Sequence, residues 1–303
     1  MAKQKSSKKQ PKKPSKIIKT PKPNAKIENQ YKKALIAQTN KMNKSLKWWA
    51  VARINKGKGN VASQMRIEFS ELSEYWNSEF NEFAKKTAEK MVKQTAKENA
   101  ILLKSQGFSD FTKISTNALK TALKAEINKN IALIQSIPRE QILRYENTIF
   151  DNIANLDRQG VKETILQIEK KLKVADNIAL RRAKTIARDQ TKKACETLAQ
   201  TMAQDSGFEY YVWITANDER VSGNPNGKYP NLKGGHWKLN NRIYRYDTPT
   251  AIIDSYGTCG TCGERVNCRC TSGAVYLMPN ETLRLVRDSE HGDYYEIVDK
   301  QTQ

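Results

Sequence analysis

The sequence pattern changes near residue 208, and this change divides the chain into a helical part and a β-rich part. Before that point, apolar residues recur three or four positions apart over long runs, which is the spacing of one helix face. Beyond it, strand-like runs such as Tyr210-Tyr-Val-Trp-Ile-Thr215 alternate with segments rich in Gly, Pro and Asn. The pattern predicts an α+β fold, with a long helical N-terminal stem or bundle followed by a small, loop-rich β module at the C-terminus.

Composition predicts four segments along the chain. Residues 1–26 are rich in Lys and Pro and contain no acid, so they cannot bury a core and we expect a disordered tail. A helical domain is expected over 27–206, a cysteine-containing β module over 207–278 and a C-terminal tail over 279–303. Shorter expectations are a hairpin at 238–246 and strands at 273–277 and 294–298.

Gly and Pro set the expected helix boundaries, because Gly is costly inside a helix and Pro is tolerated in its first turn. The predicted helices cover about 27–53, 61–105, 110–134, 138–159, 161–172 and 175–205. The adjacent Trp48 and Trp49 fit either burial against a neighbouring helix or an exposed docking pair. Cys195 lies beside a stripe of small residues, so we expect a buried, unreactive thiol there.

The charge indicates a polyanionic partner. Lys and Arg number 53 against 32 Asp and Glu, which gives a formal net charge of +21 and is typical of proteins that contact nucleic acid or an anionic surface. Lysines without interleaved aromatics would neutralise phosphates and read no bases; the alternative is a tail that only keeps the protein in solution. The candidate DNA-contacting residues are Lys3, Lys5, Lys8, Lys9, Lys12, Lys13, Lys16, Lys19 and Lys22. No run of about 20 apolar residues occurs, so no membrane partner is expected.

Four of the five cysteines lie in the short segment Cys259-Gly-Thr-Cys262-Gly-Glu-Arg-Val-Asn-Cys268-Arg-Cys270. The first pair has the spacing of one half of a zinc ribbon, and the second pair is one residue shorter than the usual partner. One structural zinc ion held by all four thiolates is therefore one interpretation, and a disulfide or four free thiols is the other. His236 is a weaker candidate ligand, since a lone His in a Gly-rich loop more often makes hydrogen bonds.

Enzyme signatures are lacking in the sequence. The His-x-Glu pair of zinc deaminases, the His-Glu-x-x-His of metalloproteases and a Gly-rich phosphate loop do not occur. We therefore expect no catalytic residue. A metal-dependent nuclease or other nucleic-acid-binding enzyme stays as the alternative, and it would need the fold to gather Asp218, Glu219 and Glu264 around His236.

A series of short motifs over residues 175–277 carries a family resemblance. The series consists of Arg181-Arg-Ala-Lys-Thr-Ile-Ala-Arg188-Asp-Gln190, Trp213-Ile-Thr-Ala-Asn-Asp218-Glu-Arg220-Val221, His236 with Leu239, Ile243-Tyr-Arg-Tyr-Asp-Thr-Pro249, and Asn267-Cys268-Arg269-Cys270. It resembles the phage head morphogenesis proteins, which are the minor head proteins similar to the Mu F protein. Two features depart from the family: a Gly-, Asn- and Pro-rich insertion over 222–235 ahead of His236, and the additional Cys259–Cys262 pair.

The resemblance implies a minor capsid protein of a tailed phage and not an enzyme. It implies association with the portal protein, with capsid or scaffold proteins in the procapsid interior, and with packaging or ejection of genomic DNA. The protein would be assembled in the host cytoplasm and would reside in the virion, inside the head near the portal vertex. The matched positions Trp213, Asp218, Arg220, His236, Asn267 and Arg269 would be structural.

Overall fold

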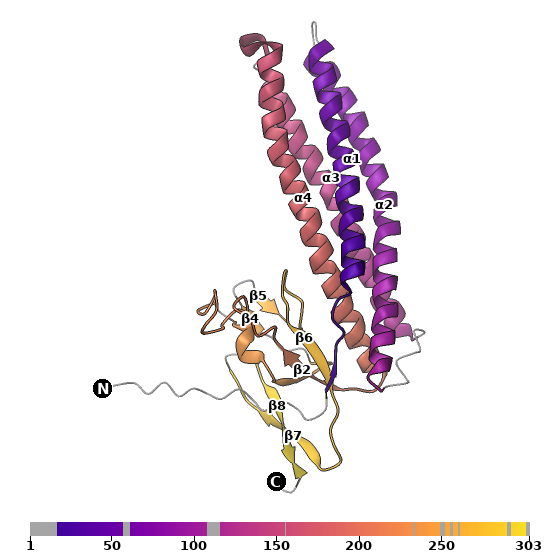
Figure 1. Ribbon diagram of the computed structural model, residues 1–303, viewed down its shortest axis with the longest axis vertical. Coiled ribbons are helices and arrows are strands. Elements are labelled where there is room, and N and C mark those ends of the chain that lie inside the picture. The colour runs from indigo at the N-terminus through magenta and orange to yellow at the C-terminus, as the bar shows by residue number, and fades with distance from the viewer. Residues whose placement is uncertain are drawn as a thin grey trace, which may run out of the picture. The chain divides into compact units, whose positions relative to one another are not determined.

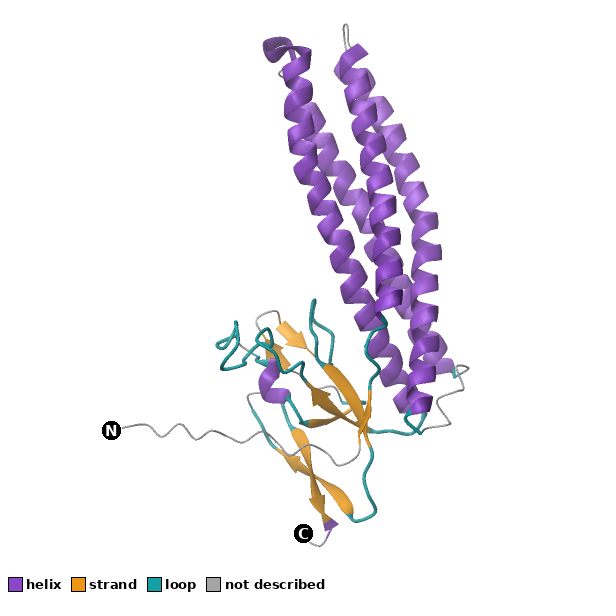
Figure 2. Ribbon diagram, viewed as in Figure 1, coloured by secondary structure: helices purple, strands orange, loops and turns teal. Residues whose placement is uncertain are grey.

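The structure, a computed structural model, describes residues 17–56, 61–107, 116–154, 156–232, 234–248, 252–254, 257–259, 261–289 and 292–300. Four helices account for most of the N-terminal part: α1 (Ala25–Lys56), α2 (Val61–Ser105), α3 (Asn117–Ile153) and α4 (Leu156–Asp205) (Figure 1). A small set of antiparallel strands follows α4 (Figure 2). The predicted α+β fold, with long helices first and a small β module after them, is confirmed.

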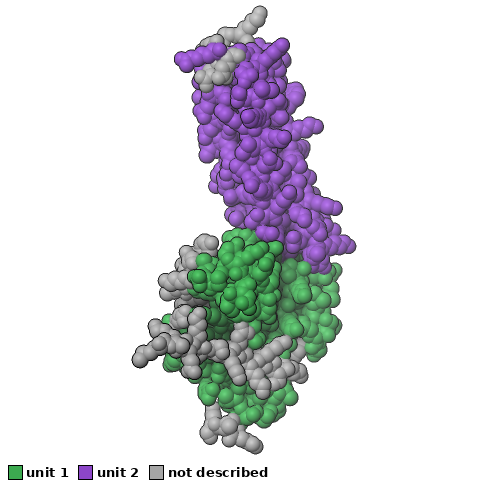
Figure 3. All heavy atoms as spheres, turned by 60° about the vertical axis from the view of Figure 1, so that its left-hand side comes forward, with its two compact units in different colours: residues 1–23, 95–123, 192–303 green, residues 24–94, 124–191 purple. Residues whose placement is uncertain are grey.

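Two compact units divide the chain differently from the expected boundary at residue 207. One unit comprises residues 24–94 and 124–191, and the other comprises 1–23, 95–123 and 192–303 (Figure 3). Helices α2, α3 and α4 each contribute residues to both units. The last part of α4 therefore belongs to the same unit as the sheet, which places its side chains beneath the cysteine-rich loop.

The helix boundaries differ from the predicted ones at Pro138 and near residue 173. Pro138 lies inside α3 and does not begin a new helix. Its neighbours Ile134 and Ile137 are buried, and this packing offsets the lost backbone hydrogen bond. The expected break near residue 173 is absent from α4, whereas the expected break at Gly160 is confirmed, because this residue has non-helical dihedral angles, with φ of 76°. Cys195 on α4 is buried as expected, and burial raises the pKa of its thiol to about 12.

Polar side chains are buried between the helices of the unit 24–94 and 124–191. The Tyr145 hydroxyl donates to Asp176 Oδ1 at 2.6 Å, and Gln141 Nε2 donates to Asn43 Oδ1 at 3.1 Å. These bonds join α1, α3 and α4. Because a buried polar group without its partner is costly, they favour one register of the three helices over others.

The main sheet has six antiparallel strands in the order β1-β6-β2-β3-β8-β7. The strands are β1 (Ile17–Lys19), β2 (Tyr210–Ile214), β3 (Ile243–Arg245), β6 (Thr271–Val275), β7 (Glu281–Val286) and β8 (Tyr294–Asp299), and β4 (Ile252–Asp254) pairs with β5 (Gly257–Cys259) in a separate ladder.

Three sequence expectations for this part of the chain are wrong. Residues 17–19 lie in the segment expected to be disordered, but they form an edge strand on β6, with Ile18 buried. The expected tail over 279–303 supplies the hairpin β7–β8, which extends the sheet beyond β3, although the strand expected at 294–298 is confirmed as β8. The expected hairpin at 238–246 does not form, because His236–Leu239 is a short 3₁₀ helix and β3 pairs with β2 and β8.

None of the described helices contains a stretch that is both long and apolar enough to cross a bilayer.

Candidate metal centre

Strand β2 directs its large side chains to both faces of the sheet, as strand geometry requires. Tyr211 and Trp213 lie on the face that also buries Leu239, Tyr244, Cys262 and Cys270, whereas Val212 lies on the opposite face with Ile243 and Val275. The first face is where the cysteine-rich loop is covered by aromatic rings.

His236 is held against β2 by the segment that follows it. Its ring lies edge-on to the buried Trp213 indole, with ring centroids 5.3 Å apart. The Asn241 backbone N–H donates to the Trp213 carbonyl at 2.8 Å, and the Trp213 N–H donates to the Arg242 carbonyl at 2.8 Å. His236 itself is buried, so the imidazole faces the sheet and not the solvent.

The insertion over 222–235 does not displace His236, because its two ends meet. The His236 N–H donates to Ser222 Oγ at 3.1 Å, and the Trp237 N–H donates to the Ser222 carbonyl at 3.0 Å. A Cβ on Gly223 would lie 2.7 Å from the Gly235 Cα, so the two backbones approach too closely for a side chain. In space, His236 therefore follows directly after Val221–Ser222.

Two side chains of α4 form hydrogen bonds with the backbone of the Cys268-Arg-Cys270 segment and of Ser272 beyond it. Lys192 Nζ donates to the carbonyl oxygens of Cys268 at 2.6 Å and Cys270 at 2.9 Å. The fully buried Glu196 accepts the Ser272 N–H at 2.8 Å. Lys192 and Glu196 are four residues apart, so they lie on one face of α4 and together hold the backbone of residues 268–272.

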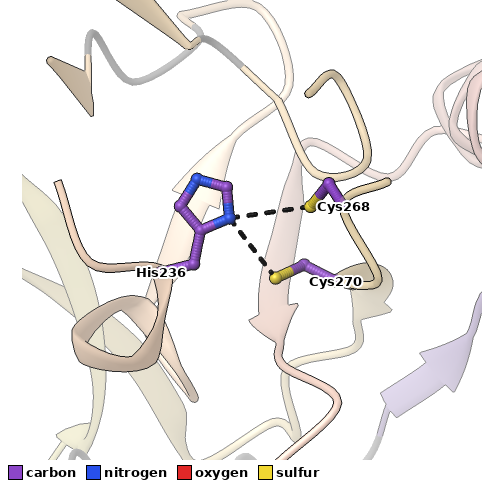
Figure 4. A group of neighbouring side chains, drawn as sticks. All are labelled: His236, Cys268 and Cys270. Atoms are coloured by element: carbon purple, nitrogen blue, oxygen red, sulfur yellow. Dashed lines mark hydrogen bonds between the residues drawn. The ribbon is translucent and has the colours of Figure 1, made fainter. Parts of the chain in front are cut away.

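These supports bring one imidazole and two thiols together (Figure 4). The Nδ1 atom of His236 lies 3.6 Å from Cys268 Sγ and 3.6 Å from Cys270 Sγ. The three ligand atoms all lie within 4.8 Å of one another. Metal–ligand bonds of about 2.0 Å to nitrogen and 2.3 Å to sulfur at a tetrahedral ion would separate nitrogen and sulfur by about 3.6 Å. The group can therefore hold a metal ion with little movement.

The two thiols differ in acidity. A hydrogen bond from the Cys270 thiol lowers the pKa of Cys268 well below its ordinary value, and His236 adds to this effect while burial opposes it. The same hydrogen bond, together with burial, raises the pKa of Cys270. Cys268 is thus the first of the pair to become a thiolate, which is the form that binds metal.

The motif positions outside the ligand group brace the same loop. Arg269 forms an ion pair with Asp218, and Asp218 Oδ1 also accepts the Arg220 N–H at 2.9 Å. Asn267 has φ of 61°, a left-handed conformation that Asn tolerates better than most residues, and it turns the chain into Cys268. The Asp218 and Asn267 motifs, far apart in sequence, are joined by this contact.

The structure gathers only part of the predicted ligand set. Cys268 and Cys270 are joined by His236, which the sequence ranked below the four cysteines. Cys262 is buried in the same hydrophobic cluster but is not in the group whose ligand atoms lie within 4.8 Å. The Cys259 side chain lies outside the described residues, although its backbone is in β5.

The carboxylates of the nuclease alternative have other partners. Asp218 pairs with Arg269, Glu219 pairs with Lys228 at 2.8 Å, and Glu264 accepts the Thr261 N–H at 3.2 Å. Among the described residues, the group around His236 contains no carboxylate.

Most of the lysines expected to contact DNA, from Lys3 to Lys16, precede the described residues. Lys19 lies in β1 and Lys22 just beyond it, and both are exposed. Their side chains therefore face solvent at the edge of the sheet, where phosphate contact is sterically open.

Sequence reasoning missed Lys192 and Glu196. A Lys and a Glu four residues apart on a helix are typical of a solvent-exposed ion pair, and nothing local distinguishes this pair. The one signal is their position beside the stripe of small residues at Ala194 and Cys195, which marks the face of α4 that is covered.

No family model matches the chain, and no solved structure matches it. An uncharacterized protein of Haemophilus influenzae is 28% identical over 154 residues, which are 51% of this chain and 29% of that protein. The chain thus spans less than a third of the length of that relative.

Proposed function

We propose that the chain is a minor capsid protein of a tailed-phage head, and that one zinc ion on His236, Cys268 and Cys270 stabilises its C-terminal module. The observation that carries the proposal is the meeting of the motif residues at one place. Trp213, His236, Cys268 and Cys270 converge, and Asp218 pairs with Arg269 beside them. A motif series spread over many residues is expected to converge in this way if it maintains one structural centre.

The donor set favours zinc over other abundant ions. Imidazole nitrogen and thiolate sulfur suit Zn²⁺, whereas Ca²⁺ and Mg²⁺ require oxygen ligands. The separations of 3.6 Å agree with tetrahedral geometry.

The head role would use the rest of the chain for contacts. The net charge of +21 supports an interior location beside packaged DNA, with the Lys-rich N-terminal segment on phosphates. The portal protein and the capsid or scaffold proteins would be the protein partners, and the virion near the portal vertex would be the location.

Quantitative mass spectrometry of purified particles tests the head role. The amount of this chain would be measured against the major shell protein in procapsids and in mature particles. A few copies per particle are expected. Absence from both kinds of particle would overturn the proposal.

A nuclease assay tests the alternative that the protein is a metal-dependent enzyme. Full-length protein would be incubated with supercoiled plasmid and Mg²⁺, Mn²⁺ or Zn²⁺, beside a His236→Ala variant. We expect no cleavage above the background of the variant. Metal-dependent cleavage that is lost in His236→Ala would favour the enzyme.

A further inference from the structure

The neighbouring tryptophans of α1 have opposite environments. Trp49 is anchored on α2, with its ring centroid 5.4 Å from that of Phe69 and its Nε1 donating to Glu68 Oε2 at 3.3 Å. Trp48 points away from the helices and is 73% exposed. The two interpretations left open by the sequence therefore apply to one residue each: Trp49 is half-buried and packs against a neighbouring helix, and Trp48 is exposed.

The face of α1 that displays Trp48 is basic. Over its whole length α1 carries eight Lys or Arg and one acid, Glu28. Lys44 lies one turn before Trp48 and Lys33 lies three turns before Lys44, so the three share a face. Lys33 and Lys44 are exposed and make no ion pair with any other described residue. We call Lys33, Lys44 and Trp48 the basic face.

Helix α2 presents a face of the opposite character. Between residues 67 and 84 it carries five Glu and no Lys or Arg. Ile67, Glu71 and Tyr75 are four residues apart, and Glu74 lies three residues after Glu71. All four are exposed, with Ile67 57% and Tyr75 50% accessible. Glu71 and Glu74 form no ion pair within the described part of the chain. We call these four residues the acidic face.

We propose that the protein self-associates, with the basic face of α1 in one copy docked on the acidic face of α2 in a second copy. Each face combines unpaired charge with large exposed apolar side chains, and the charges have opposite sign. Trp48 would be the central anchor, since tryptophan is enriched among the residues that carry most binding energy. Opposite charges around it would align the copies and speed their encounter. This proposal does not depend on the metal centre or on the head role.

Reciprocal charge reversal tests the proposal on the full chain. One variant carries Lys33→Glu and Lys44→Glu, and the other carries Glu71→Lys and Glu74→Lys. Each alone would place like charges on both faces and should weaken self-association at least tenfold, as measured by analytical ultracentrifugation at low salt. When the two variants are mixed, every basic–acidic contact is restored, and the mixture should associate as the unaltered protein does.

Matched substitutions of exposed apolar residues complete the test. Trp48→Ser should weaken association by roughly 30-fold, the effect of losing one hot-spot residue. Leu166→Ser on α4, where the side chain is 61% exposed, should leave association unchanged. Circular dichroism would confirm equal helix content in all variants. A protein that stays monomeric at low salt, or a Trp48→Ser variant that associates normally, would overturn the proposal, as would a mixture of reversed variants that stays dissociated.

Discussion

Replacing Lys192 by Met tests whether α4 positions the two cysteines of the candidate metal centre. The substitution keeps most of the aliphatic stem but removes both hydrogen bonds to the carbonyl oxygens of Cys268 and Cys270. A hydrogen bond from a charged donor contributes about 1.5 kcal/mol or more, so two of them give about 3 kcal/mol. Because Lys192 is only half-buried, water can hydrogen-bond to the two carbonyl oxygens and offset part of the loss. We therefore expect the free energy of unfolding to fall by about 2 kcal/mol.

The effect on metal binding distinguishes positioning from simple stability. Loss of a group that orients a metal ligand typically lowers metal affinity 10- to 100-fold, so Lys192→Met should bind zinc roughly tenfold more weakly in competition with a chromophoric chelator. Lys184→Met, at an exposed position of the same helix, is the matched control for lost charge and should bind zinc as the unaltered protein does. Unchanged zinc affinity in Lys192→Met would refute the positioning role.

Three further predictions concern the N-terminal segment, strand β6 and Glu196 of α4. Removing residues 1–16, which keeps β1, should reduce the slope of log K against log salt for DNA binding by up to about 6, since seven lysines are lost; an unchanged slope would exclude phosphate contact by this segment. Gly273→Ala would place a Cβ 2.4 Å from Ile17 Cγ2 and should cost about 1–3 kcal/mol in chemical denaturation. Adding Ile17→Ala should recover part of that loss, because it removes the side chain that the new Cβ meets. If the loss of stability in the double variant equals the sum of the losses in the two single variants, the clash is contradicted. Burial raises the pKa of Glu196 above its ordinary 4.5, so the folded state keeps a proton that the unfolded chain releases, and stability falls as pH rises above about 4.5. Glu196→Gln should flatten that decline in thermal unfolding, and an equally steep decline in the variant would show that another group causes it.

Long helices were predictable because their signal is local. The expected helix over 61–105 agrees with α2, since a sustained apolar stripe ends at a glycine. Pro138 was misplaced because packing around it, and not its own preference, decides whether α3 continues. The edge strand at Ile17–Lys19 could not be found locally, because its partner β6 lies at the other end of the chain.

The candidate metal centre was only partly predictable from the sequence. The spacing indicated Cys259 and Cys262 more strongly than Cys268 and Cys270, yet Cys268 and Cys270 are the pair that lies beside His236. The position of His236 depends on an insertion whose ends meet at Ser222. Sequence distance between His236 and the Asp218 motif gives no sign of that closure. The hydrogen bonds from Lys192 form because the cysteine loop covers that face of α4. This is a tertiary contact, and no local sequence pattern indicates it.

The count of zinc ions per chain, measured by native mass spectrometry, tests the metal centre most directly. The full-length protein would be purified under reducing conditions with zinc present, beside Cys270→Ser and Cys262→Ser variants. We predict one zinc in the unaltered protein and in Cys262→Ser, and none in Cys270→Ser. A zinc-free unaltered protein, or a Cys270→Ser variant that keeps its full zinc content, would contradict the account.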